Sequence, residues 1–368
     1  MVEELGSNSS PPSEQPPTPL VAISILNWNG WRDTLECLAA IQRLDYPNYL
    51  TVVVDNGSWN DSVERTKAWA RERLGPEQVL AEYARASALQ GGDPEMETAL
   101  GRVRSAQRLV LICNEENRGF AGGHNIAIRY ALSRRQAADF IFLLNNDAVI
   151  PSDCLTRLIA VQRAANAGIV GPSVNVKDHP HLKGEGPFSI RESFFAPFVR
   201  ARAPSETTGK PYYESDFVIG AAMLVRKDVL ADIGSSAGEY LRSDLFYSGE
   251  EESFCFAAKQ RDYSIVMTTD TVVDHLWGTS TGGKGSILMY YYGQRNPVLM
   301  ARVMLPFRQR MLFYPLNLGI ATGRIVKNLF RWRVKVAWAV LQGVLDGYRG
   351  RVGKWKYHDR EVKESRSP

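Results

Sequence analysis

Cysteine is scarce in this sequence, and that scarcity excludes two classes of protein. The chain of 368 residues has four cysteines, which lie far apart: Cys37, Cys113, Cys154 and Cys255. They show neither the close pairs of a zinc site nor the dense spacing of a disulfide framework. Cys37 and Cys154 fall in stretches with helical patterning, and Cys113 falls in a strand-like run. We therefore predict buried thiols in a protein of the reducing cytoplasm.

Long apolar runs and an export signal are also missing. No stretch approaches the roughly 18 to 20 apolar residues that a membrane-spanning helix requires. Residues 1–19 contain Pro, Ser and Gly but almost no large apolar side chain, which predicts a disordered tail. These residues do not show the charged-then-apolar order of a signal peptide, so we do not expect export.

The net charge of +4 conceals an asymmetry along the chain. Residues 302–356 carry twelve Lys or Arg and one acid, whereas residues 1–301 carry 29 bases and 36 acids. The basic part is also apolar and aromatic, and on helices such a mixture is typical of a segment lying on anionic lipid. We predict that residues 302–368 form a helical extension, peripheral on the inner face of the cell membrane. Simple packing on the main domain and nucleic-acid binding are the alternatives, and the acidic main part disfavours nucleic acid.

Residues 140–150 are the most informative stretch of the chain. A fully apolar run of strand length stops at Asn145, Asn146 and Asp147. Such a run predicts a strand buried on both faces, as in parallel sheets covered by helices. Its polar end then lies at the carboxyl edge of the sheet, where α/β proteins bind ligands. The carboxylate and amides could hold a divalent cation or the hydroxyls of a sugar or nucleotide, or they could merely form a turn.

The same pattern recurs at three other strand-like runs, which end at Asn27, Asp55 and Asn114. Helical stretches at 31–44 and 62–74 alternate with these runs. The alternation predicts an α/β main domain over residues 20–301, with a mostly parallel central sheet flanked by helices. Residues 72–107 are helix-prone and interrupt the alternation, so we expect a peripheral insertion there. The polar strand ends should gather in one binding crevice.

Three further clusters carry candidate chemistry. Residues 117–125 form a Gly-rich segment, expected as a loop before a helix at 126–133, whose N–H groups could bind a diphosphate. The segment does not match the G-x-G-x-x-G pattern of nicotinamide sites. Residues 250–252 are three glutamates, which could supply a general base or a solvated face. His275 ends another strand-like run and could be a cation ligand, a phosphate donor or a structural residue.

Taken in order, these motifs resemble those of glycosyltransferase family 2, and within it the bacterial rhamnosyltransferase-like enzymes of polysaccharide assembly. The matching segments lie at 26–29, 54–58, 117–123, 145–147, 219–223, 250–251, 275 and 295–296. The resemblance implies a GT-A fold, a UDP- or TDP-linked sugar donor, a saccharide or lipid-linked acceptor, and inverting transfer assisted by Mg²⁺ or Mn²⁺. Rhamnose is one candidate sugar.

The resemblance also implies roles for particular residues. Asp55 would contact the donor's base or ribose, Asp147 and His275 would lie at the metal-bound diphosphate, and Glu251 would act as the base with help from Glu250. The other implied donor contacts are Asn27, Asn29, Asn56, Gly119, Gly122, Asn125, Asn145 and Asn146, and the implied acceptor contacts are Gly220, Ala221 and Arg295.

Two departures and two alternatives accompany this interpretation. Asn145 stands in place of the first Asp of the strict D-x-D motif, and Ser253 in place of a frequent acid after the base. A sugar-1-phosphate nucleotidyltransferase would carry a Gly-rich, basic loop after its first strand, where this chain has residues 27–30. A non-catalytic carbohydrate-binding or scaffold protein would be favoured by loss of the carboxylates, all of which are present here.

Overall fold

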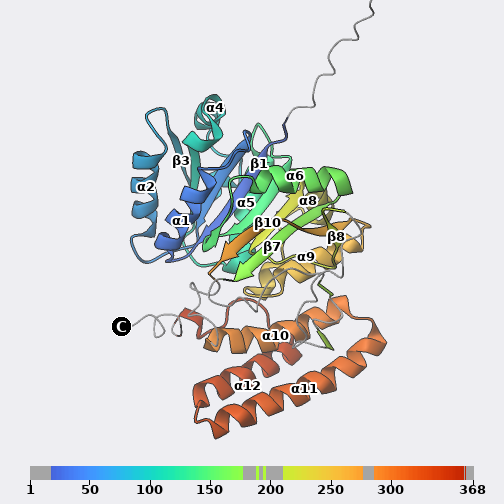
Figure 1. The fold of residues 1–368 in the computed structure, drawn as a ribbon. Helices are drawn as coiled ribbons and strands as arrows, with labels where there is room; N and C mark the ends of the chain where they lie inside the picture. The colour runs from blue at the N-terminus through green and yellow to red at the C-terminus, as the bar shows by residue number, and fades with distance from the viewer. Residues whose placement is uncertain are drawn as a thin grey trace, which may run out of the picture.

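A central sheet covered by helices on both faces forms the main body of the computed structural model, and three helices lie against one edge of that sheet (Figure 1). The structure describes residues 18–176, 188–189, 194–195, 210–276, 286–359 and 361. The predicted disordered tail lies outside the described residues except for its last two positions. Residues 360 and 362–368 of the predicted extension also lie outside them.

Within the described residues, ten strands form one sheet in the order β3-β4-β2-β1-β5-β9-β7-β10-β6, with β8 paired to β10. The first five strands in this order are mutually parallel, and β7 and β10 are parallel to each other. The prediction of a mostly parallel sheet is therefore confirmed. The strands are β1 Val21–Asn27, β2 Tyr49–Asp55, β3 Val79–Ala84, β4 Arg108–Cys113, β5 Phe140–Asn145, β6 Ala148–Val149, β7 Ile169–Val176, β8 Tyr213–Glu214, β9 Ala222–Arg226 and β10 Ile265–His275.

The central strands are buried on both faces because helices cover each side of the sheet. Every residue of β2 is buried, as the unbroken apolar run predicts. Alternate residues of β1 face two different cores, with Ala22 on one side and Ile23 on the other. The helices of the main domain are α1 Trp31–Ile41, α2 Ser62–Arg73, α3 Arg85–Ala88, α4 Pro94–Arg102, α5 Gly119–Ser133, α6 Cys154–Ala165, α8 Lys227–Ile233 and α9 Glu250–Lys259.

Most of the cysteine side chains are buried in these cores. Cys37, Cys154 and Cys255 are buried and Cys113 is partly buried, and no described cysteine forms a disulfide. Burial raises the pKa of the Cys154 thiol to about 12. The prediction of buried thiols is confirmed for three of the four.

The segment 72–107 differs from the expected helical insertion. Residues 79–84 form β3, which pairs in parallel with β4 and becomes the edge strand of the main sheet. Helix α4 is capped by Asp93, the residue before its first position, whose side chain accepts hydrogen bonds from the N–H groups of Glu95 and Met96. The segment therefore extends the sheet, and its helix-prone composition concealed one short strand.

The C-terminal helices form a layer of their own. They are α10 Ile287–Met304, α11 Phe307–Phe330 and α12 Val334–Arg349. The predicted boundary between residues 301 and 302 falls inside α10, so the layer starts earlier than expected. Two glycines of α12 allow close approach to α10, because a Cβ at Gly343 would lie 2.5 Å from the Tyr291 carbonyl oxygen and one at Gly347 would lie 3.0 Å from that of Arg295.

The layer is joined to the main domain through aromatic side chains. Trp28 and Phe246 of the main domain share one buried cluster with Tyr291, Tyr292 and Trp355. Packing on the main domain, one of the alternatives for the basic extension, thus applies to α10 and to the segment after α12. Among the described residues, no helix combines the length and the apolar character needed to cross a bilayer.

A buried ion pair fastens the 72–107 segment to α5. The Glu97 carboxylate accepts from Arg134 Nε at 2.7 Å and from the hydroxyls of Tyr83 at 3.0 Å and Tyr130 at 2.5 Å. We expect Glu97→Gln to lower the free energy of unfolding by about 3 to 5 kcal/mol, because it leaves the Arg134 guanidinium buried without its counter-charge. Urea-induced unfolding measures the loss. The exposed pair Arg157–Asp153 supplies the control, Asp153→Asn, which should leave stability unchanged. A loss below 1 kcal/mol for Glu97→Gln would contradict the expectation.

Candidate functional site

The carboxyl edge of the sheet gathers the polar strand ends, as the sequence predicts. In the pairing of β1 with β2, Asn27 lies opposite Asp55. In the pairing of β1 with β5, Leu26 lies opposite Asn145. Because these strands run in parallel, Asn27, Asp55 and Asn145 end at one edge and the loops that follow them form a common surface.

Asp55 is held rigidly at the end of β2. It is 3% exposed, and its carboxylate accepts hydrogen bonds from Asn27 Nδ2 at 2.7 Å, from the Ser58 N–H at 2.9 Å and from Ser58 Oγ at 2.7 Å. A carboxylate offers about four acceptor positions. These three donors therefore leave about one acceptor position of the Asp55 carboxylate unused.

Asn27 connects the Asp55 end of the site to the β5 end. Its Oδ1 accepts from the Gly30 N–H at 3.1 Å and from Thr34 Oγ1 at 3.0 Å. Asn146 Nδ2 in turn donates to Thr34 Oγ1 at 3.0 Å. A continuous chain of buried hydrogen bonds thus runs from Asp55 through Asn27 and Thr34 to Asn146. Thr34 lies on α1, and its spacing in the sequence carries no signal that would have revealed this role.

Two of the predicted donor contacts shape the surrounding loops. Asn29 adopts a left-handed backbone with φ of 56°, and its side-chain oxygen accepts from the Trp59 N–H at 2.9 Å. Asn56 is 1% exposed, and its amide group binds Asn117, Asn114 and the carbonyl of Gly119. Its contacts bind the loop after β4 to the end of β2.

Asp147 and His275 meet at the centre of the edge. Asp147 Oδ1 lies 3.0 Å from His275 Nε2, and Asn145 Nδ2 lies 3.0 Å from the same nitrogen. Both Asp147 and His275 are at least 92% buried, with exposures of 6% and 8%. Among the residues that the structure describes, no group of three or more His, Cys, Asp or Glu side chains could hold a metal ion. A cation here would need the remaining ligands from water or a bound phosphate, which is how Mg²⁺ usually binds.

The Gly-rich segment is helical, not the predicted loop. Helix α5 begins at Gly119, seven residues before the expected start at 126. Gly119 has φ of 74°, and a Cβ at this position would lie 2.3 Å from the Phe246 carbonyl oxygen. That same oxygen accepts from the Phe120 N–H at 3.1 Å. One N–H group of the helix start, expected to bind a diphosphate, is therefore already used by the loop that contains Phe246.

The remaining predicted residues of α5 have internal partners. Asn125 binds the backbone of residues 240 and 241 through both ends of its amide. A Cβ at Gly122 would lie 2.8 Å from Arg118 Cβ, so no bulk fits there without a shift. His124, between them, lies 2.7 Å from Ser24 Oγ, and burial lowers its pKa to about 3. The imidazole of His124 is therefore neutral and part of the core.

The three glutamates of α9 face different environments. Glu250 is 1% exposed, and burial, followed by the Glu251 charge, raises its pKa well above the usual glutamate value. Burial also raises the pKa of Glu251, while the backbone N–H groups of residues 251, 220 and 249 oppose the rise. The pKa of Glu252 is raised to about 8, first by burial and then by Glu251. The partly exposed Glu251 thus combines a raised proton affinity with hydrogen bonds that favour its ionised form.

The Gly220–Ala221 turn joins the β5 end of the site to Glu251. The Ala221 carbonyl oxygen accepts from the Asn145 N–H at 3.0 Å. On the other side of this turn, a Cβ at Gly220 would lie 3.4 Å from Glu251 Cδ. Two of the three predicted acceptor contacts therefore lie between the strand end that bears Asn145 and the carboxylate of Glu251.

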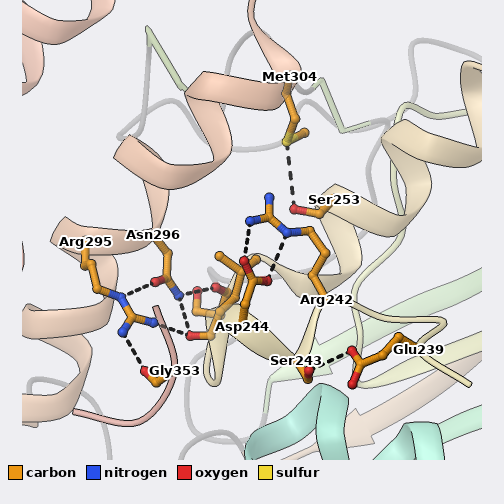
Figure 2. A network of polar contacts seen from close by, with 11 residues as sticks. Glu239, Arg242, Ser243, Asp244, Ser253, Arg295, Asn296, Met304 and Gly353 are labelled. Atoms are coloured by element: carbon orange, nitrogen blue, oxygen red, sulfur yellow. Dashed lines mark hydrogen bonds and ion pairs between the residues drawn. The ribbon is translucent and has the colours of Figure 1, made fainter. Parts of the chain in front are cut away.

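Arg295, the third predicted acceptor contact, lies elsewhere. It is 1% exposed, and its guanidinium donates to the carbonyl oxygens of Leu245 at 2.6 Å and Gly353 at 2.5 Å (Figure 2). Its Nε donates to Asn296 Oδ1 at 2.9 Å. Each guanidinium nitrogen thus has a partner within the protein, and the acceptor contact of Arg295 stays a prediction. The neighbouring Asn296, for which the sequence predicted no contact, binds the carbonyl oxygens of residues 245, 247 and 248.

Comparisons with known proteins agree with this geometry. Residues 97–234 match the family described as Glycosyl transferase family 2. The low-salt glycan biosynthesis hexosyltransferase Agl10 of Haloferax volcanii is 24% identical over 245 residues, which are 65% of this chain and 75% of that protein. The dTDP-rhamnosyl transferase RfbF of Shigella flexneri is 25% identical over 280 residues, which are 71% of this chain and 86% of that protein.

The fold is similar to that of solved glycosyltransferases. The mannosyltransferase PcManGT of Pyrobaculum calidifontis, solved with GDP-Man and Mn²⁺, has a TM-score of 0.55 and 14% sequence identity, over 90% of this chain and 88% of that one. This likeness concerns the arrangement of the sheet and helices. Residues 97–234 therefore match a glycosyltransferase family 2 domain, and the fold of the chain is of the GT-A type.

Proposed function

We propose that the protein transfers a hexosyl group, with rhamnose as a candidate, from a nucleotide-diphosphate sugar to a hydroxyl of a saccharide or lipid-linked acceptor, with inversion at the anomeric carbon. One observation carries the proposal. Three carboxylates lie close to one sheet edge. Buried hydrogen bonds run from Asp55 through Asn27 and Thr34 to Asn146, the neighbour of Asp147. The Asn145 N–H binds the Ala221 carbonyl of the turn that packs against Glu251.

The donor would occupy the part of the edge between Asp55 and Asp147. The one free acceptor position of Asp55 suits a base N–H or a ribose hydroxyl. Asp147 and His275 would hold a divalent cation, Mg²⁺ or Mn²⁺, together with the diphosphate, and the cation would neutralise charge on the leaving group. The name of the Shigella relative supports TDP-linked rhamnose as the donor, and the GDP-Man and Mn²⁺ of the Pyrobaculum structure support a cation beside a nucleotide sugar.

Glu251 would be the base of the transfer. The acceptor oxygen forms a bond to the anomeric carbon, the bond from that carbon to the phosphate oxygen breaks, and the acceptor proton passes to Glu251. A base works best when its pKa lies near the working pH. The raised pKa of Glu251 supports this role. Glu250, which is 1% exposed and whose pKa is raised well above the usual glutamate value, would stay protonated and add no second negative charge.

The donor site can be tested without an acceptor. At about 100 times its Kd, a nucleotide should stabilise the folded protein by roughly 2.7 kcal/mol, seen as a rise in melting temperature. We expect UDP or TDP to produce this rise with Mn²⁺ or Mg²⁺ present. Asp147→Asn should remove the metal-dependent part of the rise, whereas Asp55→Asn should weaken nucleotide binding with or without metal. No response of the wild-type protein to either nucleotide with metal would contradict the proposal.

The base can be tested by a matched pair of substitutions in one helix. Glu251→Gln keeps the shape of the side chain but cannot take a proton, so single-turnover transfer should slow by about 10² to 10⁴ with donor affinity unchanged. Glu252→Gln is the control and should transfer at the wild-type rate. The wild-type protein should lose stability from pH 6 to pH 8, because the folded state holds the Glu252 proton, with a pKa of about 8, that the unfolded state has already released; Glu252→Gln should not show this loss. An essential Glu252 beside a dispensable Glu251 would reassign the base.

We also propose that the C-terminal layer lies on anionic lipid. The outer side of α11 exposes Phe307 at 67% and Leu312 at 68%, and the turn to α12 exposes Phe330 at 83% and Trp332 at 90%. Exposed basic residues accompany them: Arg308, Lys327, Arg331 and Arg333. The chain contains no Asp or Glu between positions 274 and 346. Exposed aromatics beside arginines, without acids, suit the headgroup region of an anionic membrane.

Vesicle sedimentation tests this surface. We expect the protein to bind vesicles of mixed anionic and neutral lipid, and binding to fall as salt screens the charge. A double substitution, Phe330→Ser with Trp332→Ser, should release most of the protein. Val272→Ser, at a 47% exposed apolar position of the sheet, is the control and should bind as the wild type does. A wild-type protein that sediments with no vesicle, or equally with neutral ones, would contradict the electrostatic part of the proposal.

A further inference from the structure

The loop before Glu251 has an unfavourable backbone conformation. Phe246, Ser248 and Gly249 have φ values of 66°, 69° and 98°. Positive φ values are unfavourable for non-glycine residues, and two so close together persist only where the surroundings impose them. Such strain is commonly found beside functional groups. The surroundings that impose it here can be identified.

Two adjacent side chains of α10 hold this loop (Figure 2). Asn296 Nδ2 lies within hydrogen-bonding distance of three carbonyl oxygens, at 3.2 Å from Leu245, 2.7 Å from Tyr247 and 2.7 Å from Ser248. Arg295 Nη2 donates to the Leu245 oxygen as well, at 2.6 Å. Because Arg295 Nε donates to Asn296 Oδ1, the amide of Asn296 is oriented with its nitrogen toward the loop.

One peptide group transmits this contact to Glu251. The Ser248 carbonyl and the Gly249 N–H belong to the same planar unit and point in opposite directions. Asn296 binds the carbonyl side, at 2.7 Å. The N–H side hydrogen-bonds Glu251 and favours its ionised form. Hydrogen bonds arranged in such a row polarise and strengthen one another.

We propose that Asn296, oriented by Arg295, is a positioning residue for the base: it fixes the Ser248–Gly249 peptide so that the Gly249 N–H meets the Glu251 carboxylate. The proposal deepens the assignment of Glu251 as the base and rests on it. Arg295 and Asn296 have no contact with substrate in this role. They act through the backbone, from a helix of the C-terminal layer.

The proposal predicts a shift of the pH–rate profile. Transfer requires ionised Glu251, so activity falls as the pH drops through the pKa of Glu251. Loss of the Gly249 hydrogen bond would disfavour the ionised form and move this acidic limb to higher pH. Since hydrogen bonds to charged groups are worth about 1.5 to 3 kcal/mol and one pKa unit is 1.36 kcal/mol, a shift of about one to two pH units is expected for Asn296→Ala.

A matched control separates positioning from simple loss of stability. Asn317 is a buried amide of the same helical layer, which accepts from Gln294 Nε2 at 3.1 Å. Asn317→Ala should destabilise the fold to a similar degree while leaving the acidic limb in place. If Asn296→Ala fails to fold, Arg295→Lys provides the milder test, because lysine keeps the charge but has no Nε donor to orient Asn296. The acidic limb of the pH–rate profile of Arg295→Lys should move to higher pH as well, by a smaller amount.

Failure of this proposal can be told apart from failure of the base assignment. The carboxyl ¹³C resonance of Glu251, assigned by its loss in Glu251→Gln, reports the pKa of Glu251 with no acceptor present. A pKa raised in Asn296→Ala and unchanged in Asn317→Ala supports positioning, even if Glu251→Gln proves active and the base must be sought elsewhere. An unchanged Glu251 pKa in Asn296→Ala, or lower activity without a shifted limb, overturns the proposal and leaves Asn296 a purely structural residue.

Discussion

The in-register parallel pairing of β2, β1 and β5 is the constraint on which the site depends. It places Asn27 opposite Asp55 and Leu26 opposite Asn145. A slip of one residue would turn the side chains of one strand to the other face of the sheet and separate these ends. The apolar cores on both faces prevent that slip, since each strand residue has a filled position. The stability of the sheet and the geometry of the crevice therefore have the same physical origin.

The strand pattern alone was enough to predict the sheet and the positions of Asp55 and Asp147 at its edge, because alternation and polar strand ends are local properties. Local pattern could not show that Gly119 is needed for close approach to the Phe246 carbonyl, so a helix start was interpreted as a loop. It also could not show Arg295 facing backbone carbonyls, since buried and ligand-contacting arginines look alike in a sequence. The short strand β3 was hidden by the helical composition around it. Such features are set by contacts between segments far apart in the chain.

The two faces of the C-terminal layer have different surroundings. Its inner face, on α10, holds the loop that precedes Glu251, the candidate base, and the glycines of α12 allow that helix to pack closely against α10. Its outer face, on α11, leaves apolar side chains such as Phe307 and Leu312 about two-thirds exposed. The basic, aromatic composition that suggested a separate appendage thus belongs to a part of the molecule that also completes the candidate active site.

Helix α10 lies between the sheet edge and the other two helices of the layer. The layer therefore sets the distance between Glu251 and the outer side of α11. With the outer side of α11 on a lipid surface, Glu251 stands above that surface by at least one helix diameter, about 10 Å. A hydroxyl located within the headgroups would lie below the reach of the base. An acceptor that projects a phosphate arm or several sugar units from the bilayer would reach it. The thickness of the helical layer would therefore select acceptors by how far their reactive hydroxyl extends from the membrane, independently of which sugar bears it.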